Sequence, residues 1–208
     1  MAKKEVPLLS LNDFLPEGSY EPVAHYLNHH KVHLTVTRRR ETLLGDYRHA
    51  HRDKAHRISV NGNLNKYSFL ITLLHELAHL FTFEQYGNRV APHGTEWKTI
   101  YGQILADFTG RGFFPGDVEA TLLSSLKNPA ATTCGDEQLL RVLRNYDAKK
   151  SHIKLVEELP AGQPFRIRGG RYFIRGEKLR TRYKCYEPAT RKWYLFSGLF
   201  EVEPVEKI

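Results

Sequence analysis

One five-residue stretch carries the clearest chemical pattern in the chain. Residues 75–79 read His-Glu-Leu-Ala-His, inside a run whose apolar residues recur every three or four positions, as in a buried amphipathic helix. Four residues turn an α-helix through about 400°, so the imidazoles of His75 and His79 project from one face, where they can bind one metal ion. Glu76 lies about 100° round the helix. Its carboxylate can reach a water molecule beside the metal and act as a general base.

A third metal ligand must come from elsewhere, because a catalytic zinc usually has three protein ligands and one open position. His93 is the best candidate, since it follows the predicted helix after a loop with a glycine and a proline that can fold back. Glu96 is the alternative. We therefore expect one zinc ion bound by His75, His79 and His93. The competing interpretation is that the two helix histidines are bonded to backbone groups or water.

The helix that carries this pattern is predicted to span residues 66–86. Asn65 is a suitable N-cap and Gly87 a suitable end. A second helix is predicted over residues 95–108, directly after the loop that carries His93. Shorter patterns predict the other elements of this part of the chain: helices over 17–30, 118–126 and 136–146, and strands over 32–36 and 57–60.

The pattern changes after Lys150, where short alternating segments indicate strands. These segments are 153–156, 165–168, 171–174, 180–186, 193–196 and 199–202. The change predicts a domain boundary, with an α+β domain over residues 1–150 and a small basic all-β module over residues 151–208.

The motif and its surroundings resemble a known family. The stretch 75–79, followed by His-Gly-Thr-Glu-Trp at 93–97, closely resembles the SprT-like zinc metalloprotease domain, whose eukaryotic member Spartan cleaves proteins crosslinked to DNA. Residues 39–48 and 56–65 also resemble that family's entry into its active-site helix. The resemblance covers about residues 32–108, and residues 183–202 resemble SprT-type C-terminal segments more weakly.

The resemblance implies a zincin-like fold with His75, His79 and His93 as zinc ligands and Glu76 as the catalytic acid/base. It also implies DNA-associated or DNA-crosslinked protein substrates and a role in DNA repair. One feature departs from the family: bacterial SprT-type chains often end in a zinc ribbon with paired cysteines, whereas Cys185 stands alone. A second, structural zinc is therefore not expected.

The charge balance points to a polyanionic partner, with 31 Lys and Arg against 23 Asp and Glu, a net charge of +8 and a pI of about 9.4. Between Arg166 and Lys192 there are ten basic residues and two glutamates, with interleaved aromatic residues. We expect single- or double-stranded DNA to bind there through Arg166, Arg168, Arg171, Arg175, Lys178, Arg180, Arg182 and Lys184. The alternative is that the aromatic residues form the core of the module and the cations its solvated face. Residues 38–40, three arginines, are either an exposed strand end or a phosphate contact.

Several patterns are expected to carry no chemistry. Cys134 and Cys185 do not form a Cys-x-x-Cys pair and are expected to be reduced thiols. The other eight histidines lack paired ligand spacing, and most are expected at the surface. No signal peptide or run of about 20 apolar residues is visible, which favours a cytoplasmic protein without membrane contact.

These observations predict a zinc-dependent endopeptidase, a hydrolase, acting on proteins associated with DNA. Two alternatives remain at this level. A three-histidine zinc site can also activate water against phosphodiesters, so a metal-dependent nuclease fits the basic composition. A non-enzymatic nucleic-acid-binding protein with a structural metal would instead leave Glu76 without a role.

Overall fold

The computed structural model describes residues 8–40, 43–52, 54–126, 136–148 and 152–206. The chain divides into two units, Met1–Asp147 and Ala148–Ile208, and each has its own hydrophobic core. Within the described residues there are five α-helices and two sheets, one of them in a C-terminal all-β region. The α+β class predicted from the sequence is confirmed at this level.

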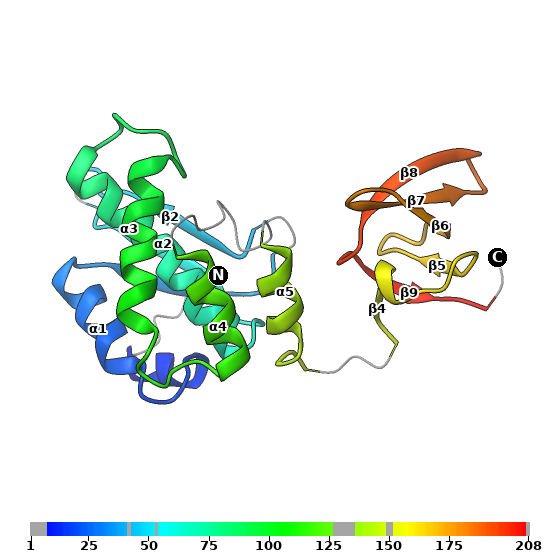
Figure 1. The fold of residues 1–208 in the computed structure, drawn as a ribbon. Coiled ribbons are helices and arrows are strands. Elements are labelled where there is room, and N and C mark those ends of the chain that lie inside the picture. The colour runs from blue at the N-terminus through cyan, green and yellow to red at the C-terminus, as the bar shows by residue number, and fades with distance from the viewer. Residues whose placement is uncertain (1–7, 41–42, 53, 127–135, 149–151, 207–208) are drawn as a thin grey trace. The chain divides into compact units, whose positions relative to one another are not determined.

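Unit 1 (Met1–Asp147) combines a small sheet with helices (Figure 1). Its elements are η1 (Leu8–Phe14), α1 (Tyr20–His29), β1 (His33–Thr37), β2 (Gly45–Arg48), β3 (Arg57–Asn61), α2 (Lys66–Tyr86), α3 (Thr95–Phe108), α4 (Gly116–Ser125) and α5 (Glu137–Arg144). The strand order is β1-β3-β2, in which β1 runs parallel and β2 antiparallel to the central β3. Helix α2 lies against β2 and β3 on one side and α3 on the other.

Helix α2 is the centre of unit 1. The Asn65 side chain accepts a hydrogen bond from the Ser68 N–H at 2.8 Å and caps the first turn, and Gly87 ends the helix with a positive φ of 63°. Its residues are buried nearly all round, because the sheet, α3 and the N-terminal segment each cover part of it. The predicted bounds of α2 and α3 are confirmed.

The three-stranded sheet has a buried face and an open face, as its alternation requires. On β3, Ile58 and Val60 are buried in the core, whereas Arg57 and Ser59 are half-buried on the other side. Strand β2 was not given bounds from the sequence, because it is four residues long and begins with a glycine. It lies at the edge of the sheet beside α2.

Unit 2 (Ala148–Ile208) is a six-stranded antiparallel sheet in the order β4-β9-β5-β6-β7-β8. Its elements are β4 (Lys154–Leu155), η3 (Val156–Glu158), β5 (Pro164–Arg166), β6 (Tyr172–Lys178), β7 (Arg182–Glu187), β8 (Lys192–Ser197) and β9 (Glu201–Pro204). Each predicted strand is present with shifted bounds, except that the first ends at Leu155, where a 3₁₀ turn begins. The core contains Val156, Phe165, Phe173, Tyr183, Cys185, Phe196 and Val202.

The prediction of reduced thiols is confirmed for Cys185, which is a free, buried thiol in the core of unit 2. Cys134 lies outside the described residues. Among the helices that the structure describes, none combines the length and the apolar character that crossing a bilayer requires.

Candidate metal centre

Helix α2 holds the first two histidines of the site. His75 is buried and His79 half-buried on the side of α2 that faces α3 and the loop before it. One turn of helix separates them, and their ring centroids lie 5.0 Å apart. Because α2 is fixed along its length by core contacts, the two imidazoles are held without loop motion.

His93 reaches the same place from the loop between α2 and α3. Its φ is 59°, a left-handed conformation that costs a residue with a Cβ on the order of 1 kcal/mol and that histidine adopts more readily than most. The Gly94 N–H donates to the Ala91 carbonyl at 2.9 Å, which closes the turn, and Gly94 then caps α3. The turn and the helix start together hold His93 in this conformation.

The three imidazoles converge on one point. A ligand atom from each of His75, His79 and His93 lies within 4.8 Å of the others, so the group can hold a metal ion. The Nε2 atoms of His75 and His93 are 3.2 Å apart. Two nitrogens bound at about 2.0–2.1 Å to one tetrahedral ion lie about 3.3 Å apart. The histidine that the sequence placed as third ligand is therefore brought to the other two.

The electrostatics of the cluster favour neutral rings. Burial, followed by the neighbouring histidines, lowers the pKa of His75 to about 3, and burial and His93 lower the pKa of His79 to about 4. Burial also lowers the pKa of His93. Neutral imidazole is the form that binds a metal. The buried Nδ1 of His75 has no hydrogen-bond partner among the described residues, so the cluster is not a satisfied polar network of the ordinary kind.

The indole of Trp97 packs against all three imidazoles of the cluster. Its ring centroid lies 4.7 Å from His75, 5.3 Å from His79 and 4.6 Å from His93. Trp97 is fully buried on the first turn of α3, so α3 both places the His93 loop and closes the site on one side. From the sequence, Trp97 was only the last residue of the stretch at 93–97, with no part in the metal site.

Glu76 lies on the neighbouring side of α2, against strand β2. It is 6% exposed, and burial, with a smaller contribution from Asp46, raises its pKa to about 8. A cation held by the three imidazoles would lower this pKa and favour the carboxylate. Gly45 makes the room: a Cβ at this position would lie 2.4 Å from Glu76 Oε1 and 2.8 Å from Glu76 Cγ. The glycine in β2 thus leaves space for the carboxyl group.

Comparison with known proteins identifies the family of the chain. A model of the SprT-like family matches residues 11–122, more than half of the 208-residue chain.

The chain belongs to the SprT-like family.

Two relatives, each described as Protein SprT, come from Yersinia pseudotuberculosis serotype O:1b (strain IP 31758) and from Yersinia pestis. Each is 50% identical to the chain over 42 residues, which cover 20% of the chain and 24% of the relative. The likeness to these SprT proteins is therefore confined to about a quarter of their length. No solved structure matches the chain significantly. Unit 2 lies outside the residues that the family model matches.

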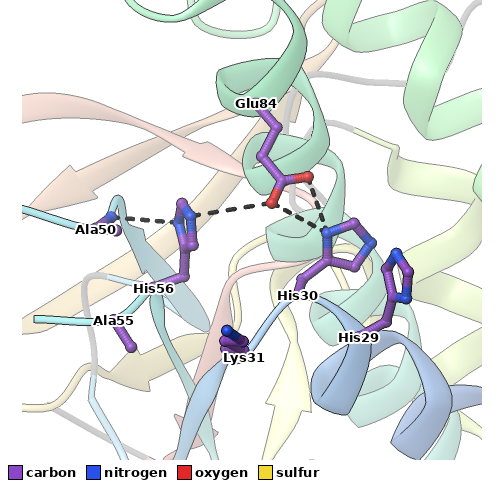
Figure 2. Close-up of a pocket in the computed structure, with 7 residues that line it drawn as sticks. All are labelled: His29, His30, Lys31, Ala50, Ala55, His56 and Glu84. Atoms are coloured by element: carbon purple, nitrogen blue, oxygen red, sulfur yellow. Dashed lines mark hydrogen bonds and ion pairs between the residues drawn. The ribbon is translucent and has the colours of Figure 1, made fainter.

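This SprT-like chain has a second group of connected polar side chains, in which His30 and His56 point toward Glu84 (Figure 2). The Tyr47 ring on β2 lies parallel to the His79 ring, with centroids 6.5 Å apart. The Tyr47 hydroxyl donates to His56 Nδ1 at 2.8 Å, and the Ala50 N–H donates to the same atom at 3.2 Å. The proton of neutral His56 is therefore on Nε2, which faces Glu84 Oε1 at 4.0 Å.

Glu84, on the last turns of α2, joins this group to α1. The Nδ1–H of His30 donates to its carboxylate, at 2.8 Å from Oε2 and 3.0 Å from Oε1. These side chains line a hollow of about 490 Å³. The expectation that most of the other histidines are exposed is confirmed for His25, His29, His33, His49, His51 and His152, but His30 and His56 are half-buried because Glu84 holds both.

The alternative ligand Glu96 does not belong to the cluster, because the group that can hold a metal consists of the three histidines. Glu96 lies half-buried in the first turn of α3, where a carboxylate stabilises the helix start.

Some of the cations predicted to bind nucleic acid in unit 2 interact instead with other side chains of the sheet. Arg166 pairs with Glu203, and Arg171 Nε lies 2.7 Å from Glu187, whose pKa it lowers to about 2. The guanidinium of Arg175 lies over the Tyr183 ring at 4.5 Å. The other members of the predicted set are Arg168, Lys178, Arg180, Arg182 and Lys184, and the Lys178 ammonium also lies over the Tyr183 ring at 5.8 Å. Of these five, Lys184 is half-buried and the rest are exposed.

One face of β7 and β8 carries both cations and exposed rings. Tyr186 pairs with Trp193 and Lys184 with Leu195 in the strand register. Trp193 is 55% exposed, and the Lys184 ammonium lies 4.8 Å from its ring centroid. The alternative, that the aromatic residues form the core, holds for Phe165, Phe173, Tyr183 and Phe196, whereas Trp193 faces outward.

Proposed function

We propose that this SprT-like chain is a zinc-dependent endopeptidase whose protein substrates are associated with DNA. The observation that carries the proposal is the convergence of three neutral imidazoles beside a buried carboxyl group on the same helix. Three nitrogen ligands with one open position are typical of catalytic zinc sites, whereas structural zinc sites usually have four protein ligands.

Each residue has a distinct part in the proposed reaction. His75, His79 and His93 would hold the zinc ion, which would act as a Lewis acid toward the scissile carbonyl. Glu76 would take a proton from the attacking water and return it to the leaving amine. Its burial between α2 and β2 keeps the carboxyl group in one orientation, and Gly45 leaves the space for it.

The sheet beside Glu76 favours a peptide substrate over a phosphodiester. Strand β2 is an edge strand, so one of its sides is unpaired among the described strands. An edge strand can bind an extended peptide by adding it to the sheet. Because Gly45 of β2 touches Glu76, a peptide bound along this edge would pass close to the proposed general base.

The face of β7 and β8 in unit 2 supports the part of the proposal that concerns DNA. Its exposed Trp193 can stack on a base, while Lys184 and Arg182 lie on the same side of the strands to bind phosphates. This set is narrower than the one predicted from the sequence, because Arg166 and Arg171 are paired with glutamates.

The decisive experiment is the metal content of the purified chain and of His93→Ala, measured by elemental analysis after expression with zinc. We expect about one zinc per wild-type chain and a large loss in the variant. Full zinc in His93→Ala would remove His93 from the ligand set. The absence of zinc from both proteins would contradict the enzyme proposal.

The substrate is tested separately with a DNA-bound protein and the same protein free of DNA. We expect faster cleavage of the DNA-bound form, and no cleavage of the DNA itself. Cleavage of phosphodiesters that depends on Glu76 would instead support a nuclease.

A further inference from the structure

The open face of the three-stranded sheet in unit 1 carries a second basic site, on the side away from α2. The side chains of Thr35, Asp46, Arg48, Arg57 and Ser59 alternate with the buried residues of their strands and line a hollow of about 180 Å³. Arg40 also lines it. None of these residues belongs to the metal cluster, which lies on the other side of β2 and β3.

Two arginines face each other across neighbouring strands in this hollow. Arg48 of β2 is the register partner of Arg57 of β3, and His33 of β1 follows on the other side of Arg57. Like charges directly opposite one another destabilise a sheet. Arg48 has a partner, since its Nε lies 2.9 Å from Asp46, but that carboxylate neutralises only one of the two cations.

Arg57 is left with no partner within the described residues. To the residues that the structure describes, its guanidinium forms no hydrogen bond or ion pair, and its Nε is buried without an acceptor. A buried donor without an acceptor destabilises the folded state. The sheet therefore carries both a charge repulsion and an unsatisfied donor at one position, and an anion bound in the hollow would offset the repulsion.

The rest of the hollow suits an oxyanion. Arg40 is held rigidly by donating to Asn61 Oδ1 at 2.8 Å and to Ser59 Oγ at 2.9 Å, so its charge stays at the edge of the hollow. Thr35 and Ser59, which carry hydroxyl groups, are register partners, two residues along their strands from the pair His33 and Arg57. Guanidinium groups with adjacent hydroxyls are the donors that bind phosphate oxygens.

We propose that this hollow binds a backbone phosphate of a nucleic acid, so that unit 1 has its own contact with nucleic acid apart from unit 2. The exposed Arg38 and Arg39 follow β1 directly and extend the basic surface from the hollow. This continuity favours a polymer of phosphates over a free phosphate ion. The proposal does not depend on the zinc site or on peptidase activity.

The test uses the full chain and compares Arg57→Gln with Arg111→Gln, which removes one exposed charge after α3 and outside the hollow. Binding of a labelled single-stranded oligonucleotide is measured over a salt series. We expect Arg57→Gln to weaken binding by roughly fivefold to tenfold near 0.1 M salt and to reduce the salt slope by about one. Arg57→Lys, which keeps the charge, should lie between wild type and Arg57→Gln. Equal affinities and slopes for the Gln variants at 57 and 111 would overturn the proposal.

A direct readout is the NMR resonance of the Arg57 Nε–H, followed with the oligonucleotide and with inorganic phosphate alone. We expect it to shift with both. A shift with inorganic phosphate only, together with unchanged oligonucleotide affinity in Arg57→Gln, would overturn the nucleic-acid assignment in favour of a free phosphate. No shift with either would overturn the site itself.

Unfolding in urea separates this role from a structural one. Because Arg57 faces a like charge and has an unsatisfied donor, the midpoint of Arg57→Gln should equal or exceed that of wild type. A clearly lower midpoint would mean that Arg57 stabilises the sheet, and would overturn the argument.

Discussion

In unit 1 the ionisable side chains of the metal cluster point inward to one buried place, whereas in unit 2 the cations point outward or lie on aromatic rings. His75 and Glu76 are almost fully buried and have strongly shifted pKa values. The unit 2 cations are paired with glutamates, stacked on rings or exposed to solvent. A buried polar cluster needs internal hydrogen bonds or a bound ligand, and a solvated one does not. This difference agrees with the proposals of a metal site in the first region and a binding surface in the second.

The largest effect should come from Glu76→Gln, which removes the proposed general base and keeps the shape of the side chain. We expect peptidase activity to fall by roughly 10²- to 10⁴-fold, with zinc content and oligonucleotide affinity unchanged. Cleavage of a protein substrate and elemental analysis would be measured on the same preparation. Full peptidase activity in the variant would mean that the metal acts without Glu76 or has a structural role.

The corresponding change in unit 2 is Trp193→Ala. Base stacking on an exposed aromatic ring contributes about 1–3 kcal/mol, so affinity for single-stranded DNA should fall by roughly fivefold to more than a hundredfold, while zinc content stays the same. Leu179→Ala is the matched control, because Leu179 is also exposed but has no ring. Equal losses in the two variants would argue against stacking.

The fit between β2 and Glu76 is tested by Gly45→Ala. The new Cβ would meet the Glu76 carboxyl group and Thr72 Cγ2 at distances of 2.4 and 2.8 Å, so we expect a loss of about 1–3 kcal/mol in the free energy of unfolding together with reduced activity. Gly116→Ala is the control, since nothing lies within 4 Å of its new Cβ. That substitution should stabilise the protein by about 0.4–1 kcal/mol.

The smallest effect concerns pH and the metal-free protein. Burial lowers the pKa of His75 and His79 from 6.5 to about 3 and about 4, so between pH 4 and 6.5 the unfolded chain binds more protons there and stability rises with pH. Burial raises the pKa of Glu76 from 4.5 to about 8, so above pH 6.5 the folded state holds a proton that the unfolded chain has lost, and stability falls. We expect a maximum near pH 6.5 and a decline of about 1–2 kcal/mol by pH 8.

Urea unfolding of chelator-treated protein at several pH values measures this profile. Glu76→Gln should abolish the decline above pH 6.5 and keep the loss on the acidic side. A variant that still declines above pH 6.5 would place the responsible group elsewhere.

Much of unit 1 was predictable because its signals are local. The bounds of α2 and α3 follow from apolar spacing, the Asn65 cap and the Gly87 end. The choice of His93 followed from its loop position and from the resemblance to the SprT-like family. Strand β2, in contrast, has too few residues for a period to be read, and its importance lies in the contact between Gly45 and Glu76, which are far apart in the sequence.

The sequence by itself determined the residues of the candidate metal site, the helix that carries two of them, the family and the all-β character of unit 2. Helical periodicity, capping and short motifs act over a few neighbouring positions, so these features can be read locally. Only the tertiary structure decided which residues surround the cluster and which cations are already engaged. His56 and Glu84 meet through packing of α2 against the sheet, Arg48 faces Arg57 through strand register, and Arg166 meets Glu203 across β5 and β9. Such contacts depend on how distant segments pair and pack, and no local pattern encodes them.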